Sequence, residues 1–150
     1  MSKIGILGTI NTSPQEVAID GLINLGTTYR KFISKNKCGF PTFSLNGNGI
    51  TINHKGMYHV TVVATVSAPV AGDVTLQLAL NGNLLAGALA TETITTADTE
   101  LRTLTIDYFV LVDNDIVLNY NTVASDTLTV INTGVESTIE NIIVNVEKEV

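Results

Sequence analysis

The sequence predicts an all-β fold of antiparallel strands, and three observations support this prediction. First, β-branched Thr and Val are plentiful, and hydrophobic residues make up 45% of the 150 residues against 15% charged residues, a composition typical of sheets and too apolar for a disordered chain. Second, apolar and polar residues alternate with a period of two along several runs. Third, turn signals of Gly, Asn and Asp recur about every ten to twelve residues, the spacing of a sandwich or barrel. The length favours one domain with a substantial core.

The clearest strands lie within residues 49–66. Ile50 and Ile52 alternate with polar residues in a short strand, and residues 54–56 (His-Lys-Gly) then read as a turn. The longer run that follows has one apolar face and one mixed face, so it belongs in the middle of a sheet that packs against another layer. Its apolar face consists of Tyr58, Val60, Val62, Ala64 and Val66.

The strands on either side of this pair follow from the same alternation. A short strand is predicted over residues 43–45 and a longer one over residues 74–80. The latter ends at Asn81-Gly82-Asn83, a hairpin turn, because Asn-Gly tolerates the positive φ that such turns need. Residues 84–95 could form a short helix, but Gly87 in their middle and the recurring Thr favour a bent strand.

The C-terminal part of the chain completes an antiparallel jelly-roll sandwich. Strands are predicted over residues 101–112, 116–120, 128–130 and 139–150. Ile139 and Ile143 lie out of phase with the apolar positions 142, 144 and 146, which predicts a bulge near Asn141. Long strands joined by hairpins and longer loops indicate a jelly-roll head domain at residues 40–150, preceded by an N-terminal arm at residues 1–39.

The N-terminal arm differs in character from the head. Its apolar stretch Ile4–Ile10 is interrupted by two glycines and a threonine, which makes a weak signal peptide and indicates an ordered arm or a first strand. Its single cysteine, Cys38, allows no intrachain disulfide and fits cytoplasmic synthesis.

Charge is distributed unevenly along the chain. Residues 1–72 carry six basic and two acidic residues, whereas residues 73–150 carry two basic and twelve acidic residues. An acidic body argues against nucleic-acid binding over its surface. Four of the basic residues lie between Arg30 and Lys37, and this stretch is either a solvated loop or a patch that docks on a negative surface.

The sequence predicts no catalytic, metal or cofactor site. Only His54 and His59 could act as imidazole bases, one in a turn and one on a mixed strand face, so we expect that the protein is not an enzyme. One Cys and two separated His do not supply the ligands of a zinc site. Residues 113–115 (Asp-Asn-Asp) offer oxygen ligands to calcium, but they are also ordinary turn residues. The chain has no glycine-rich phosphate-binding motif.

A series of motifs carries a family resemblance. Gly56 and Tyr58 lead into a long strand, a Leu-rich strand ends in Asn-Gly within residues 76–82, and an aromatic pair, Tyr108 and Phe109, precedes the Asp-Asn-Asp turn and a terminal apolar strand. This series resembles the globular head of the complement-q and tumour-necrosis-factor superfamily. Because only 5% of residues are aromatic and no collagen-like stem is present, the chain is more similar to the jelly-roll trimers of bacteriophage particles, which include head-fibre and capsid-decoration proteins.

The resemblance implies a structural phage virion protein. It implies a homotrimer that is made in the host cytoplasm and bound to the major capsid protein on the capsid surface through its N-terminal segment. The alternative is a receptor- or glycan-binding fibre tip of the same fold, with a host-surface glycan as its partner. The attachment residues implied in this way are Ile4, Ile6, Leu7, Arg30, Lys31, Lys35 and Lys37.

Two strands have a second apolar face, which fits trimerisation independently of the resemblance. A monomeric two-layer sandwich should expose one polar face of each sheet to water. However, Met57 and Val63 lie opposite the core positions of one strand, and Phe109 and Leu111 lie opposite those of another. We predict that these four residues and His59 form a trimer interface, which a three-fold ring would cover. The alternative is that the N-terminal arm covers this face as a third layer.

Overall fold

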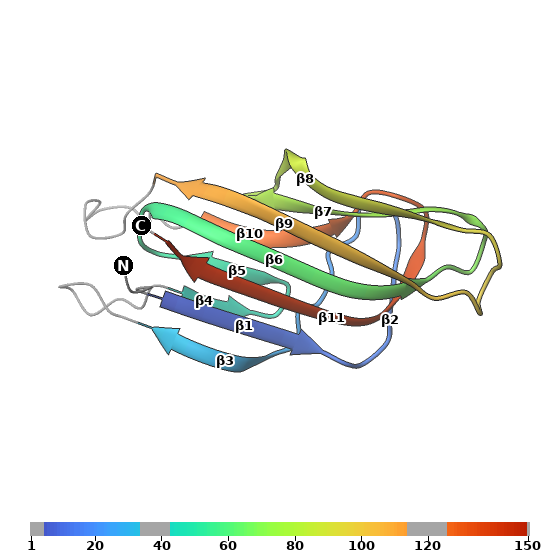
Figure 1. Cartoon of the computed structure of the whole chain (residues 1–150), viewed down its shortest axis with the longest axis horizontal. Coiled ribbons are helices and arrows are strands. Elements are labelled where there is room, and N and C mark those ends of the chain that lie inside the picture. Colours follow the sequence, from blue (N-terminus) through green and yellow to red (C-terminus); the bar gives the residue numbers. More distant parts are fainter. Residues whose placement is uncertain (1–4, 34–42, 114–125, 150) are drawn as a thin grey trace.

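A computed structural model of the chain describes residues 5–33, 43–113 and 126–149 and shows two antiparallel β-sheets packed face to face (Figure 1). The strands are β1 (Gly5–Asn11), β2 (Gln15–Val17), β3 (Thr27–Ile33), β4 (Phe43–Asn46), β5 (Gly49–Ile52), β6 (Gly56–Ser67), β7 (Gly72–Leu80), β8 (Asn83–Ile94), β9 (Arg102–Val112), β10 (Asp126–Asn132) and β11 (Ser137–Lys148). The six-stranded sheet has the order β3–β1–β11–β6–β9, with β2 also paired to β11, and the five-stranded sheet has the order β4–β5–β10–β7–β8.

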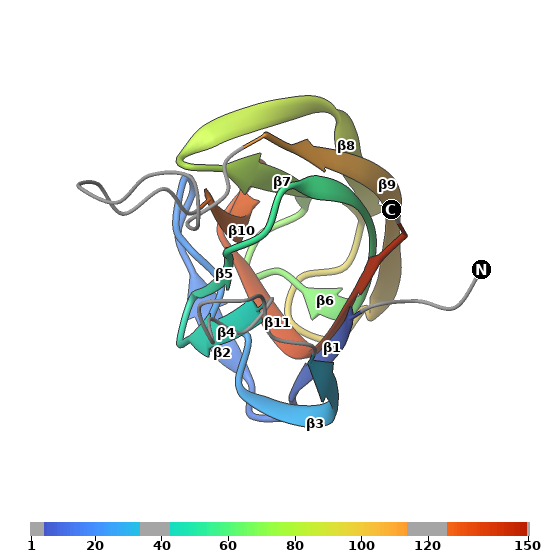
Figure 2. The ribbon, with the colours of Figure 1, turned by 90° about the vertical axis from the view of Figure 1, so that its left-hand side faces the viewer.

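Strands that are distant in the sequence are neighbours in both sheets, which confirms the predicted antiparallel jelly-roll sandwich. The last strand, β11, lies between β1 and β6, and β10 lies between β5 and β7. An end-on view shows the two sheets curving toward each other, with β8 and β9 side by side where the sheets meet (Figure 2). The predicted strand at residues 116–120 lies outside the described residues.

The core lies between the inner faces of the two sheets. The predicted apolar face of β6 is confirmed, since its five side chains are each at most 1% exposed. The two largest buried side chains, Tyr58 and Phe43, come from opposite sheets and meet edge to face, with their ring centroids 5.6 Å apart. Aromatic pairs prefer this arrangement to a face-to-face stack.

The predicted turn and bulge are both present. Asn81 and Gly82 have φ values of 54° and 82°, the left-handed conformation that a two-residue hairpin requires of both central residues. The β6–β11 register shifts between Ile139 and Asn141, where the change of phase in the sequence predicts a bulge. The strand preferred over a helix at residues 84–95 is also confirmed as β8.

A buried asparagine ties the end of β10 to its neighbours. The side-chain amide of Asn132, which is 0% exposed, donates hydrogen bonds to the carbonyl oxygens of Val17 at 3.0 Å and Val135 at 2.9 Å, and its Oδ1 accepts one from the N–H of Gly134 at 3.0 Å. One side chain therefore pairs main-chain groups of β2 and of the turn that follows β10, as buried polar groups require.

The N-terminal residues are part of the sandwich. β1 lies inside the six-stranded sheet between β3 and β11, and Leu7, Ile23 and Leu25 are at most 1% exposed in the core. Of the two structures expected for this stretch, residues 5–11 form the first strand. β1 therefore extends the sheet and does not cover its outer face as a third layer. The predicted boundary at residue 39 lies outside the described residues.

Candidate functional site

The outer face of the six-stranded sheet carries the most unusual surface of the described residues. We define it by the side chains that alternate with the core positions of β1, β6, β9 and β11, together with Arg30 and Phe32 of β3, which pair with outer-face positions of β1. The strand registers place five of these side chains in one row across the sheet. In order across the sheet they are Phe32, Ile6, Glu147, His59 and Phe109.

The β6–β9 side of the outer face is apolar and exposed. Met57 is paired with Leu111 across the two strands, and the two side chains are 41% and 61% exposed. Phe109 is 55% exposed and Val63 is 36% exposed. The structure thus brings the five predicted interface residues, including His59, onto one face. That a second copy covers this face remains a prediction.

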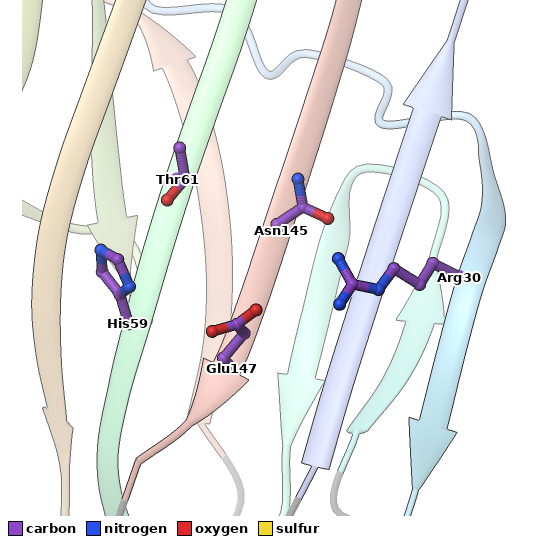
Figure 3. Close-up of a pocket in the computed structure, with 5 residues that line it drawn as sticks. All are labelled: Arg30, His59, Thr61, Asn145 and Glu147. Carbon is purple, nitrogen blue, oxygen red and sulfur yellow. The ribbon is translucent and has the colours of Figure 1, made fainter. Parts of the chain in front are cut away.

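A shallow hollow of about 170 Å³ lies beside this apolar surface and is lined by polar side chains (Figure 3). Its lining residues are Arg30 from β3, His59 and Thr61 from β6, and Asn145 and Glu147 from β11. The side chain of Arg30 extends over β1 toward β11. In the strand register, Arg30 lies opposite Gly8 of β1. The lining side chains of the hollow therefore come from strands near both ends of the sequence, β3 and β11, and from β6 between them.

Gly8 is needed because an aromatic ring lies over it. A Cβ atom at position 8 would stand 2.9 Å from Cε1 of Tyr29 and 2.7 Å from Oδ1 of Asn145. The Tyr29 hydroxyl donates a hydrogen bond to that same Oδ1 at 2.8 Å. The absence of a side chain on β1 thus lets Tyr29 reach β11 and fix one wall of the hollow.

His59 lies at the junction of the apolar and polar parts of the outer face. Its imidazole stacks on the ring of Phe109 with a centroid distance of 4.7 Å and an interplanar angle of 18°. Its Nε2 is hydrogen-bonded to a carboxylate oxygen of Asp107, and its Nδ1 lies 4.0 Å from Oε1 of Glu149. Contacts on three sides therefore set the orientation of the ring.

Two glutamates complete a group of potential metal ligands around this imidazole. One ligand atom from each of His59, Glu147 and Glu149 lies within 4.8 Å of the other two. Cys and His residues alone do not reveal this group, because two of its three members are glutamates. The signal that could have found it is the i, i+2 spacing of the two glutamates, which aims both at one face of the last strand.

The residues implied in capsid attachment have different surroundings. Leu7 is a correction, because its side chain is 1% exposed in the core and cannot contact another protein. Ile6 points to the outer face, and Arg30 and Lys31 are exposed on β3, which is an edge strand among the described residues. Ile4, Lys35 and Lys37 lie outside the described residues, as do Cys38 and the calcium candidates at positions 114 and 115.

Within the described ranges, no helix is long and apolar enough to cross a membrane. No protein-family model matches the sequence, and no curated protein matches it at a significant level.

Solved structures do match the fold over nearly the whole chain. A tumour-necrosis factor, Eiger of S. frugiperda, is similar over 100% of this chain and 94% of its own, with a TM-score of 0.66 and 13% identity. The globular domain of the zebrafish complement 1qA protein is similar over 95% of this chain and 94% of its own, with a TM-score of 0.60 and 7% identity. PRD1 vertex protein P5 is similar over 98% of this chain and 96% of its own, with a TM-score of 0.52 and 14% identity. At these identities the likeness shows the fold alone, and that fold is a jelly-roll sandwich of the tumour-necrosis-factor and complement-q type.

Proposed function

We propose that the protein is a structural component of a bacteriophage particle, a homotrimeric head-fibre or capsid-decoration protein. The observation that carries the proposal is the exposed apolar surface of β6 and β9. The likeness to a vertex protein of the phage PRD1 supports a place on a virion, and the family resemblance of the sequence supports the trimer.

The apolar surface supports association with further copies of the chain. Full burial of a Leu, Val, Met or Phe side chain contributes roughly 1.5–3 kcal/mol relative to leaving it in water. Met57, Val63, Phe109 and Leu111 are each at least 36% exposed on two adjacent strands. A closed three-fold ring would cover this surface on every copy and leave no apolar face for further growth.

The edge of the same sheet supports attachment to the capsid. β3 is an edge strand among the described residues, and its exposed side chains include Arg30, Lys31 and Phe32. A chain with a formal net charge of −6 thus carries two cations on one edge strand, with Arg30 and Phe32 on the outer face of the sheet and Lys31 on the opposite face. This basic edge is suited to a negatively charged surface of the major capsid protein, while the acidic remainder of the protein faces solvent.

Light scattering on the purified chain tests the trimer. Three copies of the 15.9 kDa chain would weigh about 48 kDa. We expect that Leu111→Asp yields monomers, because it places a charge in the covered surface. Leu84→Asp is the matched control, since Leu84 is 50% exposed on β8 of the other sheet, and this variant should remain trimeric. A wild-type mass of one chain would overturn the trimer.

Purified phage particles test the location. Mass spectrometry should find the protein in particles, and an Arg30→Glu/Lys31→Glu double variant should lower its copy number there while the mass of the free protein stays that of a trimer. A protein that is absent from particles of the phage that encodes it would refute the virion role, whatever its oligomeric state.

A further inference from the structure

We propose that His59, Glu147 and Glu149 form a binding site for a divalent cation of the zinc class, with Asp107 as the positioning residue behind the imidazole. One ligand atom from each of the three residues lies within 4.8 Å of the other two, and the His59 Nδ1 and Glu149 Oε1 atoms are 4.0 Å apart. No other group of three or more such residues occurs among the described residues.

The sheet itself brings the three ligands together. Glu147 is directly opposite His59 in the β6–β11 register, so both side chains leave the sheet on its outer face. Glu149 follows β11, and its N–H donates a hydrogen bond of 2.8 Å to the carbonyl oxygen of Met57 on β6. This bond keeps the chain beside β6 past the end of the strand. In a single chain, the His59 and Glu149 side chains are 28% and 27% exposed, so a cation can reach them from solvent.

The imidazole is oriented as a metal ligand requires. An ionised carboxylate only accepts hydrogen bonds, so the contact with Asp107 places the proton of a neutral imidazole on Nε2. The lone pair is then on Nδ1, which is the nitrogen that faces Glu149. A carboxylate that holds the second ring nitrogen of a ligating histidine is a common feature of zinc sites. The stacked ring of Phe109 further restricts rotation of the imidazole.

The ligand set selects among cations. One imidazole nitrogen and two carboxylate oxygens suit zinc, whereas calcium takes six to eight oxygens. Zinc–ligand distances of about 2.0–2.2 Å in a tetrahedral site bring ligand atoms to about 3.4 Å from one another. Rotation of the flexible glutamate side chains can close the 4.0 Å separation to this value. With three protein ligands, one tetrahedral position would remain for water or another ligand.

Isothermal titration of the EDTA-dialysed full chain with zinc chloride tests the site. We expect one zinc per chain, with affinity lost in His59→Ala and in Glu147→Gln/Glu149→Gln. Asp107→Asn should weaken binding by about 10- to 100-fold, as loss of outer-shell partners does elsewhere. His54→Ala and Cys38→Ser are the controls, because they remove the other histidine and the single thiol, and both should bind zinc as the wild type does. Excess calcium chloride should not displace the zinc.

The same titration on Leu111→Asp separates this site from the proposed trimer. All three ligands come from one chain, so a monomeric variant should still bind zinc. The proposal is overturned if the wild type takes up no zinc, or if His59→Ala and the double glutamine variant, with wild-type circular dichroism, bind zinc as tightly as the wild type. It is also overturned if Cys38→Ser abolishes binding.

Discussion

Replacement of Asn132 by alanine should destabilise the fold far more than its small change in size suggests. The substitution removes the donor to the carbonyl oxygens of Val17 and Val135 and the acceptor for the N–H of Gly134. A buried polar group that loses its partner costs about 1–3 kcal/mol. The contact with Val17 is buried and the other two are partly buried, so we take the lower end of this range for each and expect a total of about 3 kcal/mol. The main-chain hydrogen bonds of position 132 with Asp20 and Gly21 are kept.

Urea unfolding followed by circular dichroism measures this loss. In thermal unfolding of a chain of this length, a loss of about 3 kcal/mol corresponds to a fall in Tm of roughly 6–12 °C. All samples should have the same protomer concentration, because association stabilises the folded state by mass action. Asn83→Ala is the matched control, since this asparagine is exposed at the start of β8 and its loss should cost no more than about 0.5 kcal/mol. Equal, small losses in the two variants would refute the role given to the Asn132 network.

Two further predictions concern a surface carboxylate and a close approach of main chains. The pKa of Glu100 is lowered to about 2, chiefly by the hydrogen bond from the Thr95 hydroxyl, so this carboxylate adds stability that is present above about pH 4.5 and is lost as the pH falls toward 2. Thermal unfolding should therefore show wild type more stable than Glu100→Gln at pH 7 and equal to it near pH 2, and a gap that does not change with pH would contradict this. Gly134→Ala should cost about 1–3 kcal/mol by urea unfolding, because its Cβ would lie 2.4 Å from the carbonyl oxygen of Asp73. Gly87→Ala would meet only the edge of a side chain at 3.2 Å, and an equal cost in both variants would rule out the steric explanation.

The strands with one apolar face could be predicted from the sequence because burial fixes their alternation. β6, β7 and β9 each carry an unbroken row of apolar residues at every second position, and even the bulge near Asn141 appears as a change of phase. β3 lacks such a row, since its alternation is between aromatic and basic residues at the edge of the sheet. Its existence depends on pairing with β1, which local pattern does not reveal.

The apolar part of the candidate site could be predicted for the same reason, but the ligand group could not. Met57, Val63, Phe109 and Leu111 are out of phase with the core, so their common face follows from strand geometry alone. The approach of Glu147 and Glu149 to His59 depends on the pairing of β6 with the last strand of the chain. About ninety residues separate His59 from the two glutamates in the sequence. No local pattern specifies that β6 and β11 become neighbours.

The charged groups on the outer face limit which partner can cover its apolar side chains. A partner that packs on Phe109 and Leu111 must approach His59, which is stacked on Phe109, and with it three carboxylates. Burial of a carboxylate costs several kcal/mol unless it stays paired and hydrogen-bonded, and this cost opposes the roughly 1.5–3 kcal/mol gained from each apolar side chain. A bound metal or basic residues of the neighbouring copy would lower this cost, in addition to Arg30 of the same chain, which lines the hollow beside His59 and Glu147.

These two sources have opposite consequences for the edge of the sheet. A trimer that dissociates in EDTA uses the metal, and the exposed Arg30 and Lys31 of β3 are then available to bind the capsid. A trimer that persists in EDTA does not depend on the metal. If charge reversal at Arg30 and Lys31 then yields monomers, these residues belong to the interface between copies, and the attachment to the capsid must lie elsewhere on the chain.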